Sequence, residues 1–553
     1  MPVPYLLTIL LFTPAISALI TYFGGKNPRT AKRLGTILSL IPLALSAYLV
    51  YAFLFARADL VLHQSAGGVD PGRSYYAWEQ SAWISQIGVT YTLGVDELSI
   101  FLVFLTTLLT TLALVFSWDE HHRVREFYAM FLFMETTILG VFLSLDFFLF
   151  FIFWEAGLVP MYFIIAVWGG PRKRYAAIKF FLYTQAASIL VLLGIFALYT
   201  SPAGGTFDMT VLIDNNPLLA VAPALQGLVF VGLLIGFGTK LPTWPLHTWL
   251  PDAHVEAPTG GSVMLAGILL KLGGYGLIRV NVQMMEEAAK QWWWLLAALG
   301  IISIVYGAFV CLAQNDLKRL VALSSVSHMG FVTLGIAAGV YTMGTANEVG
   351  GQLGFSGAVF QQFAHGLVSP ALFMVAGAYG HKLGTRNISD LGGVAKTMPT
   401  LTWFSVIAFL ASLGLPGLVG FVAEFTVFLG VYAAWGLSLA IPLLTVVITA
   451  AYYIYAAQRA FFGPLNPKWE KAEDAHAYET APLAVLTILF VVFGVMPLLF
   501  LASIQSWSVS PRRTPTSAPT SDSVIGRSGT AIAASLSISM AICATSPPRT
   551  AIR

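Results

Sequence analysis

The sequence contains few charged residues for its length. Of its 553 residues, 10% are charged and 57% are hydrophobic, whereas about 25% of a typical soluble domain is charged. Apolar runs recur from Val3 to near Trp507, and a run of about 20 residues is enough to cross a hydrocarbon layer of roughly 30 Å. A water-soluble core is therefore excluded, and we expect almost the whole chain to be membrane domain.

Cysteine and common cofactor motifs are also scarce. Cys311 and Cys543 lie far apart, which excludes a disulfide framework, a CxxC ligand pair and an iron–sulfur motif. The sequence has no HExxH or HxxxH pattern and no GxxxxGK[ST] loop, so we expect neither a zinc site nor ATP-driven transport. His247, Asp252 and His254 surround a proline-containing turn without a fourth ligand, and we interpret that turn as structural.

The apolar runs predict about fourteen transmembrane helices in an all-α polytopic membrane protein. The first run has no basic region before it and no small-residue cleavage site after it, so we expect it to be retained. The predicted helices lie near residues 3–23, 34–56, 92–117, 127–145, 147–168, 176–200, 224–254, 260–282, 293–314, 319–341, 353–380, 400–435, 437–460 and 481–506.

Lysine and arginine are distributed unevenly between alternate loops. One set of loops holds eighteen of them, from Lys26 to Lys471, whereas the other holds Arg57, Arg73, Arg279 and Lys290. The positive-inside rule places the basic loops in the cytoplasm and both ends of the helical domain outside. The loop 57–96 is expected to form an ordered cap outside.

Several ionisable residues fall inside the predicted helices, where each costs several kcal/mol unless it is paired or hydrated. Such residues mark ion pathways or structural pairs. A simple structural pair between two helices is the alternative for Glu155 and Lys240, and ordinary packing is the alternative for the histidines. Asp146, at a helix end, is interpreted as a cap. The set comprises Glu155, Lys240, Lys271, His328, His365 and Glu424 as candidate proton-carrying residues and Glu135 as an accessory one.

Two of the predicted helices are interrupted. The segment 224–254 contains Pro242, Pro245 and Pro251, and 400–435 contains the sequence GLPGLVG before Glu424, so we expect both helices to break. The two lie five helices apart, and an odd separation inverts topology, which favours two inverted five-helix repeats with an ion site near the midplane. A generic kink is the alternative.

This repeat divides the chain into five predicted regions. They are N-terminal helices with an outer loop (1–126), a first five-helix repeat (127–282), a second, inverted repeat (293–460), a cytoplasmic loop with the last helix (461–507), and a disordered tail rich in Pro, Ser and Thr (508–553).

Four long motifs identify the chain as similar to a known family. FWEAGLVPMYFIIAVWGG, TKLPTWPLHTWLPDAHVEAPTGGSVMLAGILLKLGGYG, QNDLKRLVALSSVSHMGF and AHGLVSPALF resemble the antiporter-like membrane subunits of respiratory complex I, the proton-pumping NADH:quinone oxidoreductase. The resemblance covers about residues 90–500. Glu424 favours the group labelled M, or chain 4 in mitochondria, because the L and N groups and the sodium/proton antiporters generally have lysine there.

The resemblance implies two half-channels, with Glu155 and Lys240 as a coupling ion pair and Lys240 passing protons to Lys271. His328 and His365 would extend a hydrated axis, and Glu424 would lead to the outer exit. We expect no cofactor in this chain. NADH, FMN, iron–sulfur clusters and quinone would bind partner subunits, which would include two related antiporter-like chains.

The implied location is the bacterial inner (plasma) membrane, with the lipid bilayer and no nucleic acid as a partner. Two other functions stay open at this point. One is a subunit of a sodium/proton antiporter without a redox partner, and the other is a membrane scaffold whose buried charges only pair helices.

Overall fold

Long apolar helices make up most of the structure, a computed structural model that describes residues 4–57, 60, 62–64 and 74–505. Among these residues, fourteen segments are long and apolar enough to span a bilayer, which confirms the predicted membrane fold. The predicted tail, 508–553, lies outside the described residues. The spans are α1 (Leu6–Gly24), α2 (Pro28–Phe55), α3 with a short 3-10 turn (Ile100–Asp119), α4 (Val124–Leu143), α5–α6 (Phe147–Trp168), α7 (Lys173–Thr200), α9 (Pro223–Lys240), α11–η5 (Thr259–Val282), α13 (Glu286–Leu312), α14 (Leu317–Thr342), α15 (Glu348–Leu383), α18 with η7 (Val419–Ser438), α19 (Ala440–Ala460) and α20 (Ala477–Val495).

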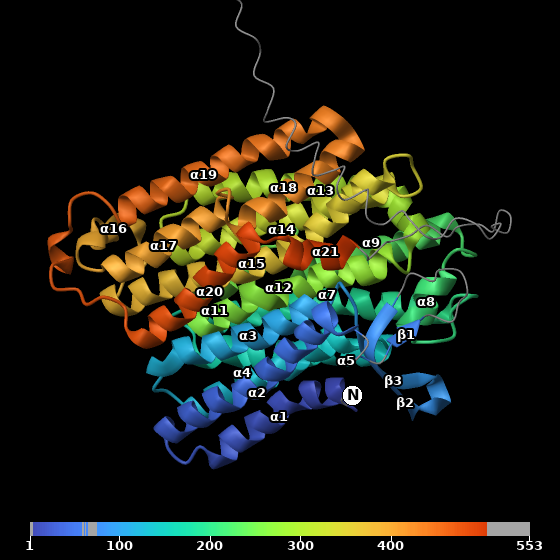
Figure 1. The fold of residues 1–553 in the computed structure, drawn as a ribbon, viewed down its shortest axis with the longest axis horizontal. Helices are drawn as coiled ribbons and strands as arrows, with labels where there is room; N and C mark the ends of the chain where they lie inside the picture. Colours follow the sequence, from blue (N-terminus) through green and yellow to red (C-terminus); the bar gives the residue numbers. More distant parts are fainter. Residues whose placement is uncertain (1–3, 58–59, 61, 65–73, 506–553) are drawn as a thin grey trace, which may run out of the picture. The chain divides into compact units, whose positions relative to one another are not determined.

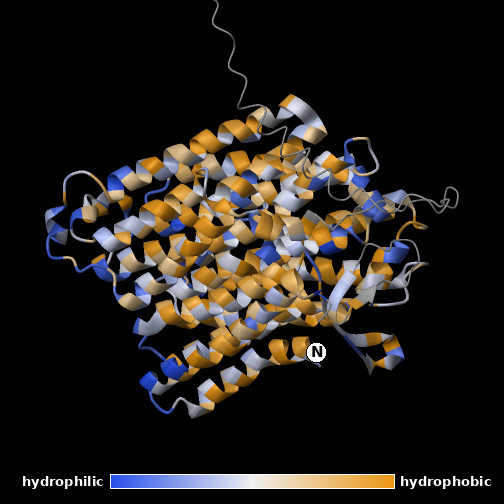
Figure 2. Ribbon diagram, in the orientation of Figure 1, coloured by the Kyte–Doolittle hydropathy of each residue, from blue (hydrophilic) through white to orange (hydrophobic). Residues whose placement is uncertain are grey.

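Three spans form the interior of the bundle. The most apolar windows of the segments 259–282, 317–342 and 348–383 are entirely buried, whereas only 33% of the α2 window and 28% of the α20 window are buried. Figure 2 shows apolar residues along the helices and hydrophilic residues gathered at their two ends. Polar side chains on the three interior helices are therefore shielded from lipid by the surrounding helices.

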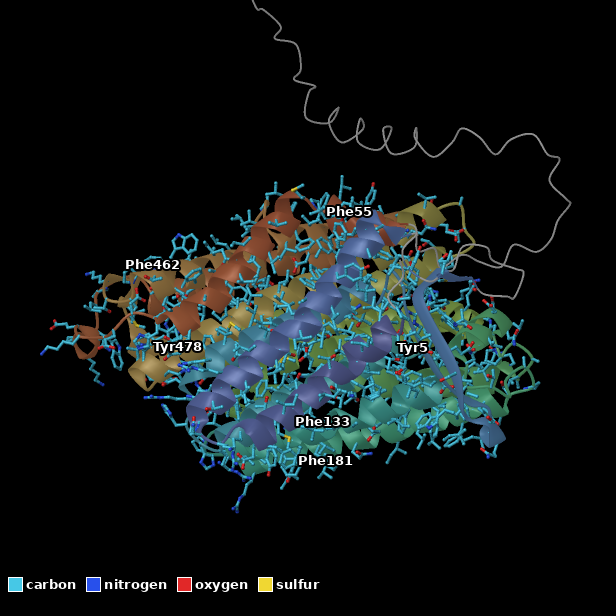
Figure 3. All side chains as sticks on the ribbon, turned by 60° about the horizontal axis from the view of Figure 1, so that its bottom comes forward. Tyr5, Phe55, Phe133, Phe181, Phe462 and Tyr478 are labelled. Carbon is cyan, nitrogen blue, oxygen red and sulfur yellow. The ribbon has the colours of Figure 1, made fainter. Side chains whose placement is uncertain are left out.

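The outer surface of the bundle is apolar, as a lipid-facing surface requires. Figure 3 labels several of its aromatic side chains, among them Tyr5, Phe55 and Phe462, which are 50% to 70% exposed. The exposed faces of the outer helices can therefore meet lipid or other apolar helices without burying unpaired charge.

Both predicted helix breaks are present. The helix α9 ends at Lys240 and α10 (Trp249–Glu256) follows after a non-helical stretch, while α17 (Pro399–Ser412) is separated from α18 in the same way. In the second break Gly414 and Gly417 have φ values of 81° and 92°, a region in which glycine is favoured. The division of the chain into two inverted repeats stays a prediction.

A small antiparallel sheet covers one end of the bundle. Its strands β1 (Leu62–Gln64), β2 (Ser74–Ile84) and β3 (Val89–Val95) lie in the order β1-β2-β3, so the predicted helix 92–117 was wrong over its first residues. The β3 sequence, VTYTLGV, is rich in β-branched residues, which favours a strand. Glu79 of β2 accepts hydrogen bonds from the backbone N–H groups of Leu7 (2.7 Å) and Thr8 (3.1 Å) and so holds the start of α1.

The sheet and the basic loops lie at opposite ends of the helices. We call them the sheet end and the basic end (Figure 1). Arg279 was predicted as a loop residue, but it lies inside the π-helical segment η5 (Leu277–Val282) and is 1% exposed. The correction strengthens the charge asymmetry, because one fewer cation belongs to the loops of the sheet end.

Candidate functional site

Lys271 lies at the centre of the bundle on a helix with two unusual segments. The span Thr259–Val282 contains the π-helical segments η4 (Leu265–Leu269) and η5 on either side of α12 (Leu270–Gly276). A π turn widens the helix and changes which carbonyl groups are bonded. The Lys271 side chain is fully buried, and its Nζ donates a hydrogen bond to the carbonyl oxygen of Ala266 in η4.

Two glycines allow this helix to approach α15 closely. A Cβ on Gly366 would lie 2.9 Å from the carbonyl oxygen of Gly267 and 3.4 Å from Cε of Lys271. Real Cβ atoms rarely come so close to a carbonyl oxygen, because the interior is densely packed. The missing side chains therefore let Lys271 reach the neighbouring helix.

Four ionisable side chains from four helices form a connected row, which we call the central row: Lys271, His365, His328 and Glu424. Nζ of Lys271 lies 2.7 Å from Nδ1 of His365, and the ring centroids of His365 and His328 are 5.7 Å apart. Nδ1 of His328 lies 3.0 Å from Oε1 of Glu424. The four residues are at most 5% exposed, so a proton on any of them is shielded from bulk water.

Hydroxyl groups accompany the row. Nε2 of His365 lies 3.0 Å from Oγ of Ser325, and Nε2 of His328 lies 3.2 Å from Oγ of Ser412. Ser412 donates to the hydroxyl of Tyr453 (2.7 Å), which donates to Ser324 (3.0 Å). Hydroxyls both donate and accept. A small cavity is also lined by both histidines and Glu424, so the site is a polar network within an apolar bundle.

Lys240 and Glu155 are not in direct contact. Nζ of Lys240 donates to the carbonyl oxygen of Trp154 (3.2 Å) and lies 3.5 Å from the centroid of its indole ring. Within the described residues Lys240 forms no ion pair, and Oε1 of Glu155 is buried without a hydrogen-bond partner. The structure therefore shows no close ion pair between them, because Trp154 provides both the acceptor and the ring face that Lys240 contacts, and the coupling of Glu155 to Lys240 stays a prediction.

The break after Lys240 packs against the helix of Lys271. A Cβ on Gly273 would lie 2.5 Å from both the backbone nitrogen of Leu241 and the carbonyl oxygen of Phe237. The end of α9 is thus held against α12, and the two lysines belong to adjoining parts of the structure.

Glu135 and Asp146 differ, although both are buried carboxylates. Glu135 on α4 is fully buried, and neither carboxylate oxygen has a hydrogen-bond partner among the described residues. Asp146 caps α5, as predicted, by accepting from the N–H groups of Phe148 (2.9 Å) and Leu149 (3.1 Å). Burial raises the pKa of Asp146 above its usual value, although hydrogen bonds from Thr90 and the cap lower it. Asp146 is structural, whereas Glu135 lies apart from the central row.

The short helix α10, between α9 and α11, contains a buried histidine that was interpreted from the sequence as structural. His254 is fully buried, stacks on Phe373 with centroids 4.4 Å apart, and has no hydrogen-bond partner for either ring nitrogen among the described residues. The next residues line a hollow of about 550 Å³ at the basic end, together with Lys318 and Arg386. His254, a buried imidazole beside a polar hollow, is therefore a candidate functional residue. Its position shortly after the helix break is the signal in the sequence that could have identified it.

The structure brings together most of the predicted set. Lys271, His365, His328 and Glu424 are connected, Lys240 adjoins them through the break in α9, and Glu155 lies beside the tryptophan that Lys240 contacts. The sequence reasoning did not identify Ser325, Ser412 or Tyr453, because isolated hydroxyl residues in apolar helices have no distinguishing pattern.

Comparisons with known proteins extend this description. Residues 144–449 match the transmembrane family described as NADH:quinone oxidoreductase/Mrp antiporter. F(420)H(2) dehydrogenase subunit M of Methanosarcina mazei is 40% identical over 89% of this chain and 94% of its own length. NADH-quinone oxidoreductase subunit M of Rickettsia prowazekii is 38% identical over 89% of this chain and 95% of its own.

A solved structure agrees with these matches. A chain of respiratory complex I from Thermus thermophilus with bound NADH superimposes with a TM-score of 0.76 at 27% identity, over 91% of this chain and 99% of that one. The likeness therefore extends over nearly the whole helical domain.

Proposed function

Because the chain belongs to the NADH:quinone oxidoreductase/Mrp antiporter family of membrane subunits, we propose that it translocates protons as a non-redox subunit of a NADH:quinone oxidoreductase. The central row is the observation on which the proposal rests. Four ionisable groups from four helices, all shielded from lipid, lie in sequence from Lys271 to Glu424. Burying ionisable groups in a membrane protein costs free energy, so those that are retained usually mark an ion pathway.

The chemistry of the row suits proton transfer. Lysine donates, imidazole accepts at one nitrogen and donates at the other, and carboxylate accepts. A proton that leaves Lys271 has His365 as its nearest acceptor at 2.7 Å, and His328 has Glu424 at 3.0 Å. The 5.7 Å between the two ring centroids requires a hydroxyl or a water for the step between the histidines.

Glu155 and Lys240 act in this proposal as an electrostatic switch that works without direct contact. A carboxylate near a lysine stabilises the charged ammonium, and its neutralisation favours proton release. Trp154 holds the ammonium by its carbonyl and ring. A change of charge on Glu155 then alters the proton affinity of Lys240. When Lys240 releases its proton, the proton passes to Lys271.

The proposal includes an orientation and a setting. The basic end faces the cytoplasm by the positive-inside rule, so protons enter from that side and leave past Glu424. The complex lies in a bacterial plasma membrane, where the chain contacts the related antiporter-like subunits through its exposed apolar faces. NADH, flavin, iron–sulfur clusters and quinone are bound by other subunits.

The test uses the intact complex in closed vesicles. In Glu155→Ala and Lys240→Ala complexes that assemble, we expect NADH-driven acidification to be lost and quinone reduction to slow, as followed with a pH-sensitive dye and by NADH absorbance. Glu286→Ala and Lys290→Ala remove a partly exposed pair at the start of α13, whose N···O distance is 2.6 Å, and serve as controls. Full acidification in either assembled mutant would contradict the proposal, while loss of assembly in both would favour the scaffold alternative.

A second function is distinguished by the same vesicles. The family description names Mrp antiporters beside NADH:quinone oxidoreductases. An antiporter subunit would exchange sodium for protons without NADH, whereas a pumping subunit acidifies only while electrons flow. Sodium-driven proton release that is insensitive to NADH would identify the antiporter.

A further inference from the structure

We infer that the ion pair between Arg279 and Asp96 is a seal that closes the sheet end of the helix of Lys271 and so prevents protons on Lys271 from leaving there. This inference rests on the proposed proton translocation. Both residues lie outside the central row, and neither contacts Lys271 or His365.

Arg279 occupies a defined position relative to Lys271. The two residues lie on the same span, eight residues apart, which corresponds to roughly 12 Å along the axis at 1.5 Å per residue. Arg279 is the one nearer the sheet end, because β3 ends at Val95 and Asp96 follows it directly. A direct passage from Lys271 along its own helix to the sheet end would have to pass this arginine.

The guanidinium group has a protein partner at each of its nitrogens. Its Nη2 lies 2.6 Å from Oδ2 of Asp96, Nη1 donates to Gln283 (3.0 Å), and Nε donates to the hydroxyl of Tyr275 (3.2 Å). The rings of Tyr275 and Tyr75 lie 5.2 Å and 5.9 Å from its central carbon. The side chains of Arg279 and Asp96 are 1% and 4% exposed. The packing therefore leaves little space for a chain of water molecules.

Arginine also stops proton transfer chemically. A guanidinium group does not lose its proton in proteins, so it cannot accept and pass on a proton as lysine, histidine or glutamate can. As a fixed cation it also repels hydronium, in the way that an arginine excludes protons from other membrane pores. The last ionisable side chain on this helix before the sheet end thus ends the relay.

The sheet holds the seal in place. The N–H of Leu145 donates to the carbonyl oxygen of Thr92 (3.0 Å), and the N–H of Thr90 donates to Asp146 (2.8 Å). These bonds attach β3 to the junction of α4 and α5. With the sheet end closed, the acceptor available to Lys271 is His365 on α15. The proton is therefore directed along the central row toward His328 and Glu424.

The experiment measures passive proton leak in vesicles that hold the intact complex. After an imposed pH difference without NADH, we expect Arg279→Gln and the milder Asp96→Asn to raise the leak rate several-fold over wild type. Lys290→Gln, which breaks a partly exposed pair at the start of α13, is the matched control and should leave the vesicles tight. During NADH oxidation the two seal variants should acidify less per electron.

The double variant Arg279→Gln with Lys271→Ala separates a seal from general damage. If the leak runs through Lys271, the double variant is as tight as wild type. A leak that persists in the double variant, or tight vesicles in both seal variants, overturns the inference. Failure of the proposed function has a different signature, namely normal NADH-driven acidification in Lys271→Ala alone.

Discussion

Lys240 and Lys271, which are both buried inside the helical bundle, have different surroundings. Lys271 is connected to His365, His328 and Glu424 by contacts between side chains. Lys240 has a backbone carbonyl and a ring face, neither of which can take up a proton. In the proposed function this difference corresponds to two tasks: the Lys240 site senses charge, and the Lys271 site conducts protons. Each prediction below tests this division.

The largest effect is expected at Lys271, the residue of the central row that lies next to the Lys240 site. Lys271→Ala removes the proton carrier at the start of the central row, and we expect NADH-driven acidification to fall by about a hundredfold, which is within the range for loss of a proton-transferring group. Dye quenching in vesicles of assembled complex measures it, with Lys468→Ala, an exposed loop lysine, as the control. Wild-type acidification in Lys271→Ala would mean that conduction does not use this row.

Glu424→Gln tests the far end of the row. The amide keeps the shape and can still bond to His328, but it cannot hold a proton for transfer, so we expect acidification to fall, though by less than in Lys271→Ala. The same vesicles serve, with Glu470→Gln in an exposed loop as the control. An unchanged rate would place the exit elsewhere than at Glu424.

Trp154→Leu tests the sensing site. The backbone acceptor of Lys240 remains, whereas the ring contact, worth about 1–2 kcal/mol when buried, is lost. We expect a fall of about fivefold in coupled acidification, measured against Trp403→Leu, an outer tryptophan that is 57% exposed. If the two leucine variants behave alike, the indole has no particular part in holding Lys240.

The smallest effect concerns the hydroxyl branch. Tyr453→Phe removes the link between Ser412 and Ser324, and the loss of the two hydrogen bonds of its hydroxyl predicts a decrease of about two- to threefold in acidification. Tyr379→Phe is a matched control, because that tyrosine is equally buried and its hydroxyl bonds to Thr402 and Ser405 instead. Equal rates in the two variants would show that the branch only supports packing.

The sequence was sufficient for features that depend on local chemistry. Apolar run lengths predicted the spans, and Pro242 and the glycines around Pro416 predicted the two breaks, because proline removes a backbone donor wherever it lies in a helix. The buried ionisable residues were also evident, since charge is rare in apolar segments.

The order of contacts among these residues could not be predicted from the sequence. Gly267 and Gly366 set the distance between the two helices beside Lys271. In the sequence nothing distinguishes them from other glycines in helices. Residues 92–95 of the short strand β3 were taken as the start of a helix, because a strand of seven residues close before an apolar run does not mark a clear boundary in the sequence. Arg279 was assigned to a loop for a similar reason: its partner Asp96 lies far away in sequence and is brought near by the fold.

The hydrogen bond between Lys271 and Ala266 has a consequence for speed. A neutral amine still donates two hydrogens, so after giving its proton to His365 the side chain can keep its bond to the carbonyl of the π-helical segment. The Lys271 nitrogen then stays close to His365 in both charge states. The side chain therefore does not need to change its rotamer between turnovers. In the proposed mechanism, the π-helical segment thus holds in one position a group that changes its charge.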